Sequence, residues 1–191
     1  MKKYFANINP SKGLLWRFVH IDHLEDILKH GIHAQDKDVC YMSSFCNDQV
    51  YNMRSVSFCN GVALNNYLSF YLNPLHPQSD SLFLRIPKDS VCILAYNIFD
   101  FDAIGIKYLI SERSPTFFFS NYYFDSSCLT QLEWNRLSRK YENINEIDSF
   151  DVEYLQSEVL VLERVPPTLI NGIVTFNQHA NDIATSIINN V

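Results

Sequence analysis

The stretch LLWRFVHIDHLEDILKHG (Leu14–Gly31) changes from a strand-like to a helix-like pattern without an intervening loop. Its first half is aromatic and β-branched, which is typical of a strand over Leu14–Ile21. In its second half Asp22 can N-cap a helix, Glu25 completes the spacing of a capping box, and Gly31 suits the C-terminal end. A strand that turns directly into a helix predicts a domain that contains both kinds of element.

The rest of the chain continues this mixture in irregular order. Runs of β-branched and aromatic residues predict strands, and apolar residues at helical spacing predict helices. The predicted strands are 67–74, 115–121, 159–162 and 170–176, and 81–87 with 90–97 are two strands or a strand and a helix start. The predicted helices are 46–55, 127–144 (followed by a polar loop to about 151) and 178–190. Because there is no internal repeat or linker, we expect one domain over residues 1–191 with an α+β fold.

The charge of the chain limits how it can bind nucleic acid. The net charge is −6 at pH 7 and the pI is near 5.4, which is the wrong sign for coating nucleic acid through bulk electrostatics. The 15 Lys and Arg residues are nevertheless enough for a local basic groove. Because 47% of the residues are hydrophobic, the chain can bury a substantial core and is not disordered.

Cysteine spacing and the lack of long apolar runs bear on metal binding and on the compartment in which the protein works. The five cysteines are scattered and form no CxxC pair, which argues against a zinc site, and we expect no bound metal. The start MKKYFANINPSKG lacks the apolar region of a signal peptide, and no apolar run reaches the length of a membrane span. We therefore expect a reduced, cytoplasmic protein without a membrane partner.

Glu158 is the most unusual of the candidate functional residues, because it stands at the mouth of the apolar strand 159–162. By strand alternation it shares a face with Leu160 and Leu162, where a carboxylate rarely lies without a partner. A lone Glu near a strand start is most often solvated, which is the alternative. Gln156 lies two residues earlier and would share this face. Such a pair can hold a ribose hydroxyl and stabilise positive charge that develops on a sugar carbon.

Three further side chains suit a ligand that carries phosphate and aromatic groups. Arg17 on the first strand could hold a phosphate or a ribose, and Arg54 could bind a phosphate through two hydrogen bonds. Tyr71 could stack on a nicotinamide ring or a base. Taken singly, each also fits a surface arginine or a core aromatic. His20 and His23 are three residues apart, but no third ligand can be named, so we reject a metal site there.

The order of these candidates is more specific than any one of them. The chain has no GxGxxG, P-loop, GxSxG or HExxH motif, so Rossmann-type NAD binding and common hydrolase chemistry are poorly supported. It runs W-R-F-V-H-I-D-H-L-x-x-I-L, Arg54, N-Y-L-S-F-Y-L-N-P, F-F-F-S-N, L-E-W and Q-S-E-V-L-V. This order resembles the DarT family of ADP-ribosyltransferase toxins, from Trp16 to Phe176. The family pattern is Y-H-I-T-H-I-x-N-L-x-x-I-L, an arginine, D-Y-V-P-F-Y-F-x-P-R-S-P, F-x-F-T-D-x-H and A-E-F-L-V.

The resemblance implies an ADP-ribosyltransferase fold, in which a split central β-sheet binds NAD in its cleft. It also implies transfer of ADP-ribose from NAD, the co-substrate, onto bases of single-stranded DNA without a metal. By position, Glu158 matches the catalytic glutamate and Arg54 the active-site arginine. Arg17 replaces the first histidine of the first motif, His20 matches the second, and Tyr71 matches a tyrosine that lines the NAD site. With Gln156 they make up the expected cofactor site.

The residues expected to face the target differ from the family pattern. We expect Tyr122 and Tyr123 to stack on a nucleotide that is single-stranded or flipped, although Tyr123 stands where the family has a histidine. His76 is expected to replace in part the arginine of P-R-S-P, because Leu75 occupies that position. These differences leave two alternatives open: an enzyme that acts on RNA, and a non-enzymatic nucleic-acid- or protein-binding module on a decayed fold. A toxin also implies an antitoxin, either a macrodomain that removes ADP-ribose or a simple binding protein.

Overall fold

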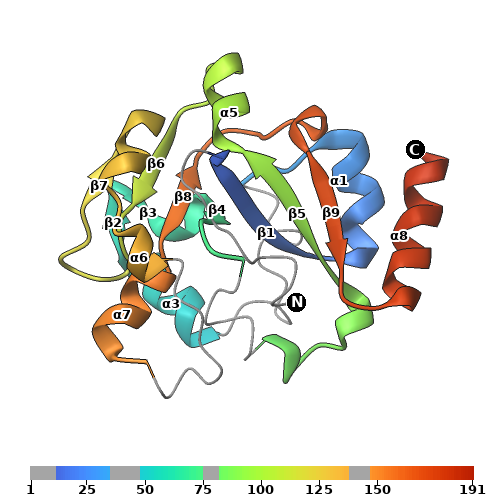
Figure 1. The fold of residues 1–191 in the computed structure, drawn as a ribbon, viewed down its shortest axis with the longest axis horizontal. Helices are drawn as coiled ribbons and strands as arrows, with labels where there is room; N and C mark the ends of the chain where they lie inside the picture. The colour runs from blue at the N-terminus through green and yellow to red at the C-terminus, as the bar shows by residue number, and fades with distance from the viewer. Residues whose placement is uncertain (1–11, 35–47, 75–81, 138–146) are drawn as a thin grey trace.

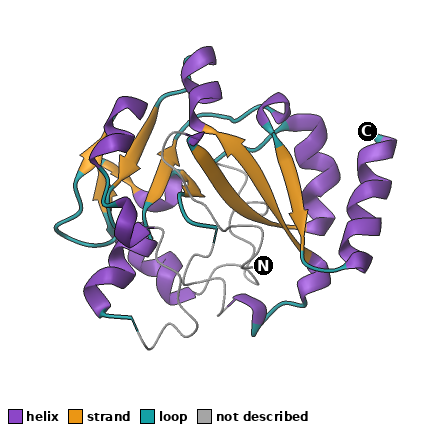
Figure 2. Cartoon of the chain, in the orientation of Figure 1, coloured by secondary structure: helices purple, strands orange, loops and turns teal. Residues whose placement is uncertain are grey.

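A seven-stranded antiparallel sheet forms the centre of the protein, and helices lie around it (Figure 1, Figure 2). The computed structural model describes residues 12–34, 48–74, 82–137 and 147–191. The strand order is β7-β6-β8-β4-β1-β5-β9, and β2 and β3 form a separate hairpin. The strands are β1 Leu14–His20, β2 Phe58–Cys59, β3 Val62–Ala63, β4 Leu68–Tyr71, β5 Val91–Asn97, β6 Tyr108–Ser111, β7 Tyr122–Tyr123, β8 Glu158–Val161 and β9 Gly172–Thr175. The expected α+β class is confirmed.

Helices cover the two ends of this sheet. Figure 1 shows α1 and α8 beside β9 at one end of the sheet, and α6 with α7 below it at the other end. The α-helices are α1 Leu24–His30, α3 Asp48–Val56, α5 Ile98–Ile104, α6 Trp134–Leu137, α7 Ser149–Leu155 and α8 Gln178–Asn190. Single 3-10 turns lie at Ile21–His23, Leu64–Asn66, Lys88–Ser90 and Pro167–Leu169, and a longer 3-10 segment at Ser126–Gln131. Among the described residues, no helix is long and apolar enough to cross a membrane.

The sheet is split between β4 and β1. Strands β1 and β5 pair along seven successive residue pairs, whereas β1 and β4 meet at the single pair Trp16 and Tyr71. Beyond this pair the two strands diverge, so that β7-β6-β8-β4 and β1-β5-β9 form two halves. Main-chain groups that face the gap need other partners, because an unpaired buried peptide group is costly. The split is the feature that the family resemblance predicts.

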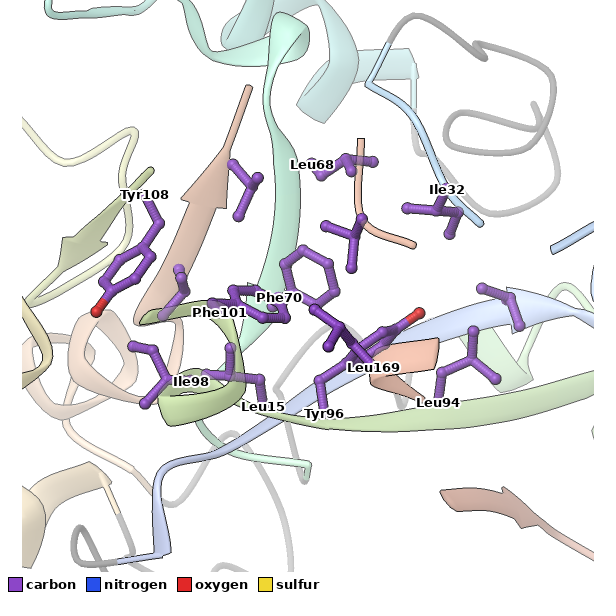
Figure 3. Close-up of a cluster of buried hydrophobic side chains, with 14 of the residues drawn as sticks. Leu15, Ile32, Leu68, Phe70, Leu94, Tyr96, Ile98, Phe101, Tyr108 and Leu169 are labelled. Carbon is purple, nitrogen blue, oxygen red and sulfur yellow. The ribbon is translucent and has the colours of Figure 1, made fainter. Parts of the chain in front are cut away.

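One hydrophobic cluster contains residues from both halves and joins them across this split. Phe70 on β4 contacts the rings of Tyr96 on β5 and Phe101 on α5, with centroid distances of 5.0 and 5.5 Å (Figure 3). All three are almost completely buried. Because burial of large aromatic side chains supplies much of the stability of a core, this contact holds the halves together where main-chain pairing stops.

The principal errors of prediction lie between β6 and β8. Residues 115–121, predicted as a strand, form turns in which Phe117 N–H donates to Ser114 and Ser120 N–H donates to Phe117. The predicted helix 127–144 is a 3-10 segment that ends before Leu132 and is followed by the short α6. Its last residues lie outside the described part of the chain. The aromatic run misled the prediction because Phe118 and Phe119 are exposed, and the leucine spacing misled it because leucines can be buried from a 3-10 segment as well as from an α-helix.

Several helix boundaries also differ from the expected ones. His20, and not Asp22, caps the first turn: its Nδ1 accepts from the N–H of Asp22 at 3.3 Å. Helices α5 and α7 were not predicted, although Asn97 and Asp148 cap them with side-chain oxygens. The segment 82–87 forms a helical turn and not a strand, while β5 confirms the strand expected at 90–97.

Gly31 ends α1 in a conformation that a side chain cannot adopt. Its φ is +75° and ψ is −163°, a region that is essentially restricted to glycine. A Cβ at this position would overlap the carbonyl oxygen of Val165, next to the bridge between Ile32 and Val165. The glycine therefore lets α1 end close against the segment that follows β8.

Gly31→Ala should destabilise the protein through both backbone strain and this overlap. We expect a loss of about 3 kcal/mol in the free energy of unfolding, measured by urea denaturation. Gly105→Ala is the matched control, because Gly105 also ends a helix with φ +78° but has no neighbouring atom within 4 Å of the place that a Cβ would take. The control should lose about 1 kcal/mol. Equal losses in the two variants would contradict the proposed close packing.

Candidate functional site

Glu158 begins β8 and is only 5% exposed, so it is not a solvated strand end. The residue before it is fixed from both sides. Ser157 is buried, and its hydroxyl donates to the carbonyl of Tyr154. Its own carbonyl accepts from the N–H of Leu72, the residue that follows β4. The carboxylate therefore projects from a rigid point between α7 and the centre of the sheet.

Arg54, in the last turn of α3, is the charge partner of Glu158. Its Nη1 donates to both carboxylate oxygens, at 3.0 and 3.2 Å, and the arginine is itself 6% exposed. Its Nη2 donates to the Leu64 carbonyl at 3.2 Å and to the Ser69 hydroxyl at 2.7 Å. Four segments thus meet at one guanidinium, which compensates the buried carboxylate.

A row of side chains crosses the sheet on the face that carries Glu158. Tyr71 lies directly opposite Glu158 in the pairing of β4 with β8. Continuing the register between β6 and β8 by one step places Ser111 opposite Glu158 on the other side, and Tyr122 lies opposite Ser111. Opposite residues of paired strands share a face, so aromatic rings flank the carboxylate on both sides.

Tyr122 is partly buried in this row and is held in place by a hydrogen bond. Its hydroxyl donates to the Pro115 carbonyl at 2.8 Å. Burial raises the pKa of Tyr122 to about 12, and the nearby Cys59 and Glu158 contribute to this rise. The phenol is therefore neutral at physiological pH. Burial likewise raises the pKa of the Cys59 thiol beside it, so this cysteine is not an activated nucleophile.

Arg17 lies at the split in the sheet and contacts the same strand as Arg54. Its side chain alternates with Trp16 and points to the core face, where its guanidinium lies 5.9 Å from the ring centre of Phe70. Its Nη1 donates to the main-chain carbonyl of Ser69 at 2.7 Å, and its Nε is buried without a hydrogen-bond partner among the described residues. Arg17 therefore satisfies a carbonyl that the divergence of β1 from β4 leaves unpaired.

The other predicted cofactor residues are less closely associated with Glu158. His20 lies at the far end of β1 from the Trp16 bridge, and contacts Asp22 and His23. Gln156 belongs to the turn that ends α7, so the strand alternation that we used to place it beside Glu158 does not apply. Their roles in binding NAD stay predictions. His76 lies outside the described residues.

Two features that the sequence analysis did not single out border the site. Ser69 accepts hydrogen bonds from both Arg17 and Arg54. The sequence could have indicated it, because strand alternation places Ser69 on the same face as Tyr71. The loop 115–121, which we call the aromatic loop, precedes Tyr122 and exposes Phe118 and Phe119 by 91% and 70%. Among the described residues, no group of three His, Cys, Asp or Glu side chains could hold a metal ion.

This geometry suits stabilisation of positive charge on a bound sugar. Arg54 uses one nitrogen to reach both oxygens of Glu158, and a carboxylate has further lone pairs that can accept from a ligand hydroxyl. A buried, preoriented anion stabilises a developing cation more strongly than a solvated one does. Tyr71 lies where it can contact a ring attached to the same sugar.

Comparisons with known proteins show which family the chain resembles. A family model described as DarT, ssDNA thymidine ADP-ribosyltransferase, matches residues 16–191. A protein of Escherichia coli O127:H6 (strain E2348/69 / EPEC), named DNA ADP-ribosyl transferase, is 26% identical over 186 residues. The match covers 92% of this chain and 85% of that protein.

Solved structures share the fold. The structure of Thermus sp. 2.9 DarT in complex with ADP-ribosylated ssDNA has a TM-score of 0.85 at 19% identity, and covers 95% of this chain and 90% of that one. The same Thermus protein in complex with NAD+ gives 0.79 at 18% identity, with the same coverage. Thermosipho africanus DarTG in complex with ADP-ribose gives 0.70 at 16%, covering 92% of this chain and 47% of that one.

Removing the charge partner of Glu158 should destabilise the fold. Arg54→Met leaves a buried carboxylate without compensation, and we expect a loss of about 3–5 kcal/mol in the free energy of unfolding, measured by urea denaturation. Arg54→Met combined with Glu158→Leu should recover much of this loss, because the unpaired charge is gone. Arg164→Met is the control, since Arg164 is exposed on the turn after β8. Equal effects of Arg54→Met and Arg164→Met would contradict a buried ion pair.

Proposed function

Because the chain belongs to the DarT family of ssDNA thymidine ADP-ribosyltransferases, we propose that Glu158 and Arg54 form the centre at which it transfers ADP-ribose from NAD to single-stranded DNA. The chain is an NAD-dependent ADP-ribosyltransferase. The observation that carries the assignment of the centre is the buried ion pair at the start of β8, with Tyr71 opposite it. NAD is the co-substrate.

In the proposed reaction, the bond between nicotinamide and the ribose C1″ of NAD breaks and leaves a cation-like sugar. Glu158 accepts a hydrogen bond from a ribose hydroxyl and stabilises this charge. A base nitrogen then forms the new bond to C1″, and Glu158 accepts the proton that this nitrogen loses. In thymidine the nitrogen that carries a proton is N3, because N1 is bonded to the deoxyribose. We therefore propose N3 of thymidine as the acceptor.

The contacts of the site assign different roles to the other residues. Both Nη atoms of Arg54 donate to protein oxygens, which favours orientation of Glu158 over binding of the NAD pyrophosphate. Tyr71 would stack on nicotinamide. Arg17 would bind the ribose or phosphate near the split, where its guanidinium bonds the Ser69 carbonyl, and His20 would do so further along the same strand.

The target nucleotide would approach from the side of Tyr122 and the aromatic loop. Phe118 and Phe119 are in edge-to-face contact, with ring centres 5.1 Å apart, and Phe117 lies beside Arg113. The loop is anchored, because the N–H of Ser114 donates to α7 at 2.7 Å. Exposed rings can stack on unpaired bases. Bases in a duplex cannot stack on these rings, because neighbouring bases already cover both of their faces. Tyr122 and Tyr123 are partly buried, so the neighbouring phenylalanines are better placed for this contact than the tyrosines.

We also propose a neutralising partner. An enzyme that modifies the bases of DNA would damage its own cell, in the cytoplasm where NAD and DNA meet. Its activity therefore calls for an antitoxin, either a macrodomain that removes ADP-ribose or a protein that covers the site. The Thermosipho relative, which is named DarTG and was solved with ADP-ribose, supports the proposal of such a partner.

Glu158→Gln should abolish transfer while the protein stays folded. We expect at least a roughly 1,000-fold loss of labelling, because the neutral amide neither stabilises a sugar cation nor accepts a proton. The assay incubates labelled NAD with single-stranded DNA, duplex DNA and RNA, and mass analysis then identifies the modified nucleoside. Glu163→Gln, on the exposed turn after β8, is the matched control and should keep full activity. An active Glu158→Gln variant would refute the assignment of the site, and labelling of RNA alone would refute the DNA substrate.

The aromatic loop should bind DNA mainly through ring stacking. Replacing Phe118 and Phe119 together by leucine keeps apolar volume but removes the ring faces, so we expect the KM for a single-stranded oligonucleotide to rise about 10-fold or more. The kcat at saturating DNA should be unchanged. Leu84→Ala, at a side chain that is 89% exposed elsewhere, is the control. An unchanged KM in the double variant would rule out this surface.

A further inference from the structure

Ser69 on β4 is the one residue that contacts both Arg17 and Arg54 in the described hydrogen-bond network. Its hydroxyl accepts from Arg54 Nη2 and its carbonyl accepts from Arg17 Nη1, each at 2.7 Å. Arg54 in turn donates to Glu158. We propose that Ser69 is a positioning residue, which holds the guanidinium of Arg54 in the orientation that presents Glu158 to the sugar of NAD. This inference rests on the proposed function of Glu158.

The position of Ser69 at the split explains how it can contact two arginines. It pairs with Leu160 on β8, two residues from the pair of Tyr71 and Glu158, so its hydroxyl lies on the face of the site. Its carbonyl points to the other side, toward β1, where main-chain pairing has stopped after Trp16. The guanidinium of Arg17 occupies the place of the missing strand partner.

The orientation of Glu158 depends on Arg54 because one nitrogen serves both carboxylate oxygens. Nη1 donates to Oε1 at 3.2 Å and to Oε2 at 3.0 Å. The plane of the guanidinium is in turn fixed by the two acceptors of Nη2, the Leu64 carbonyl and the Ser69 hydroxyl. Without the hydroxyl, the guanidinium loses its shortest hydrogen bond, so its plane and the direction of the carboxylate are held less tightly.

The hydroxyl of Ser69 is a feature of this chain and not of the shared motif. The segment N-Y-L-S-F-Y-L-N-P aligns with D-Y-V-P-F-Y-F-x-P, so the family pattern has proline at this position. Proline has no side-chain oxygen and no N–H. The N–H at position 69 faces the unpaired side of β4, so its loss would break no hydrogen bond between strands. Serine and proline are therefore both compatible with the backbone at this position.

The test is a comparison of steady-state kinetics for substitutions at Ser69, with NAD and a single-stranded oligonucleotide as substrates. Ser69→Ala should lower kcat about 10-fold and leave the KM for NAD within about twofold of wild type. Ser69→Thr, which keeps the acceptor on a strand-compatible side chain, should restore kcat to within about threefold. Ser55→Ala is the control, because its hydroxyl lies next to Arg54 on α3 but bonds to the Asn52 carbonyl.

Four results would overturn the inference. For Ser69→Ala they are a kcat within about twofold of wild type, or a rise in the KM for NAD with kcat unchanged. The other two are a folded Ser69→Thr variant whose kcat does not recover, and a loss of kcat in Ser55→Ala as large as in Ser69→Ala. If Ser69→Ala does not fold by circular dichroism, Ser69→Cys replaces it, since a thiol keeps the size and is a weak acceptor. Its kcat should lie between those of wild type and Glu158→Gln, and a wild-type kcat would overturn the inference. If wild-type protein labels no DNA, or Glu158→Gln stays active, the proposed function fails instead.

Discussion

The buried pair of Glu158 and Arg54 is the interaction on which the geometry of the site depends. Both side chains are more than nine-tenths buried, so each carries a desolvation penalty that the opposite charge of the other helps to offset. The pair joins residues 104 positions apart in the chain. For this pair to form, the last turn of α3 must lie close to Glu158 at the start of β8. The Leu64 carbonyl and the Ser69 hydroxyl must also accept from Nη2 of Arg54. The packing of four segments is therefore tied to one guanidinium.

The split in the sheet creates the second constraint. Where β1 leaves β4, a continuous sheet would have filled the space with paired main chain. Instead the core contact of Phe70 with Tyr96 holds the two halves together on one face. Arg17 closes the gap by bonding the Ser69 carbonyl. The opposite face is left to side chains such as Tyr71 and Glu158, which is the arrangement that a ligand site between diverging strands requires.

The sequence predicted the elements whose burial is visible in their composition. The strands around Val159 and Ile93 were found because each is a short apolar run, and α8 because its apolar residues recur at helical spacing. The prediction failed where aromatic residues are exposed, as at Phe118, or where a cap and not a periodic pattern begins the helix, as at Asp148. Strand alternation indicated Glu158 as an anomaly, and the family order of motifs assigned both Glu158 and Arg54 to the site, but only the structure shows that they pair. Spacing within a sequence does not report contacts between distant segments.

The acidic net charge bears on how the enzyme selects its substrate. A chain of charge −6 gains little from long-range attraction to a polyanion, so contacts at short range must supply the binding energy. The anchored aromatic loop offers such contacts through ring faces, and it lies on the side of Tyr122, beside the carboxylate. Stacking on these rings is available to unpaired bases but not to a duplex, in which neighbouring bases already occupy both faces. The proposed role of the aromatic loop, combined with weak long-range electrostatics, thus accounts for a preference for single-stranded over duplex DNA.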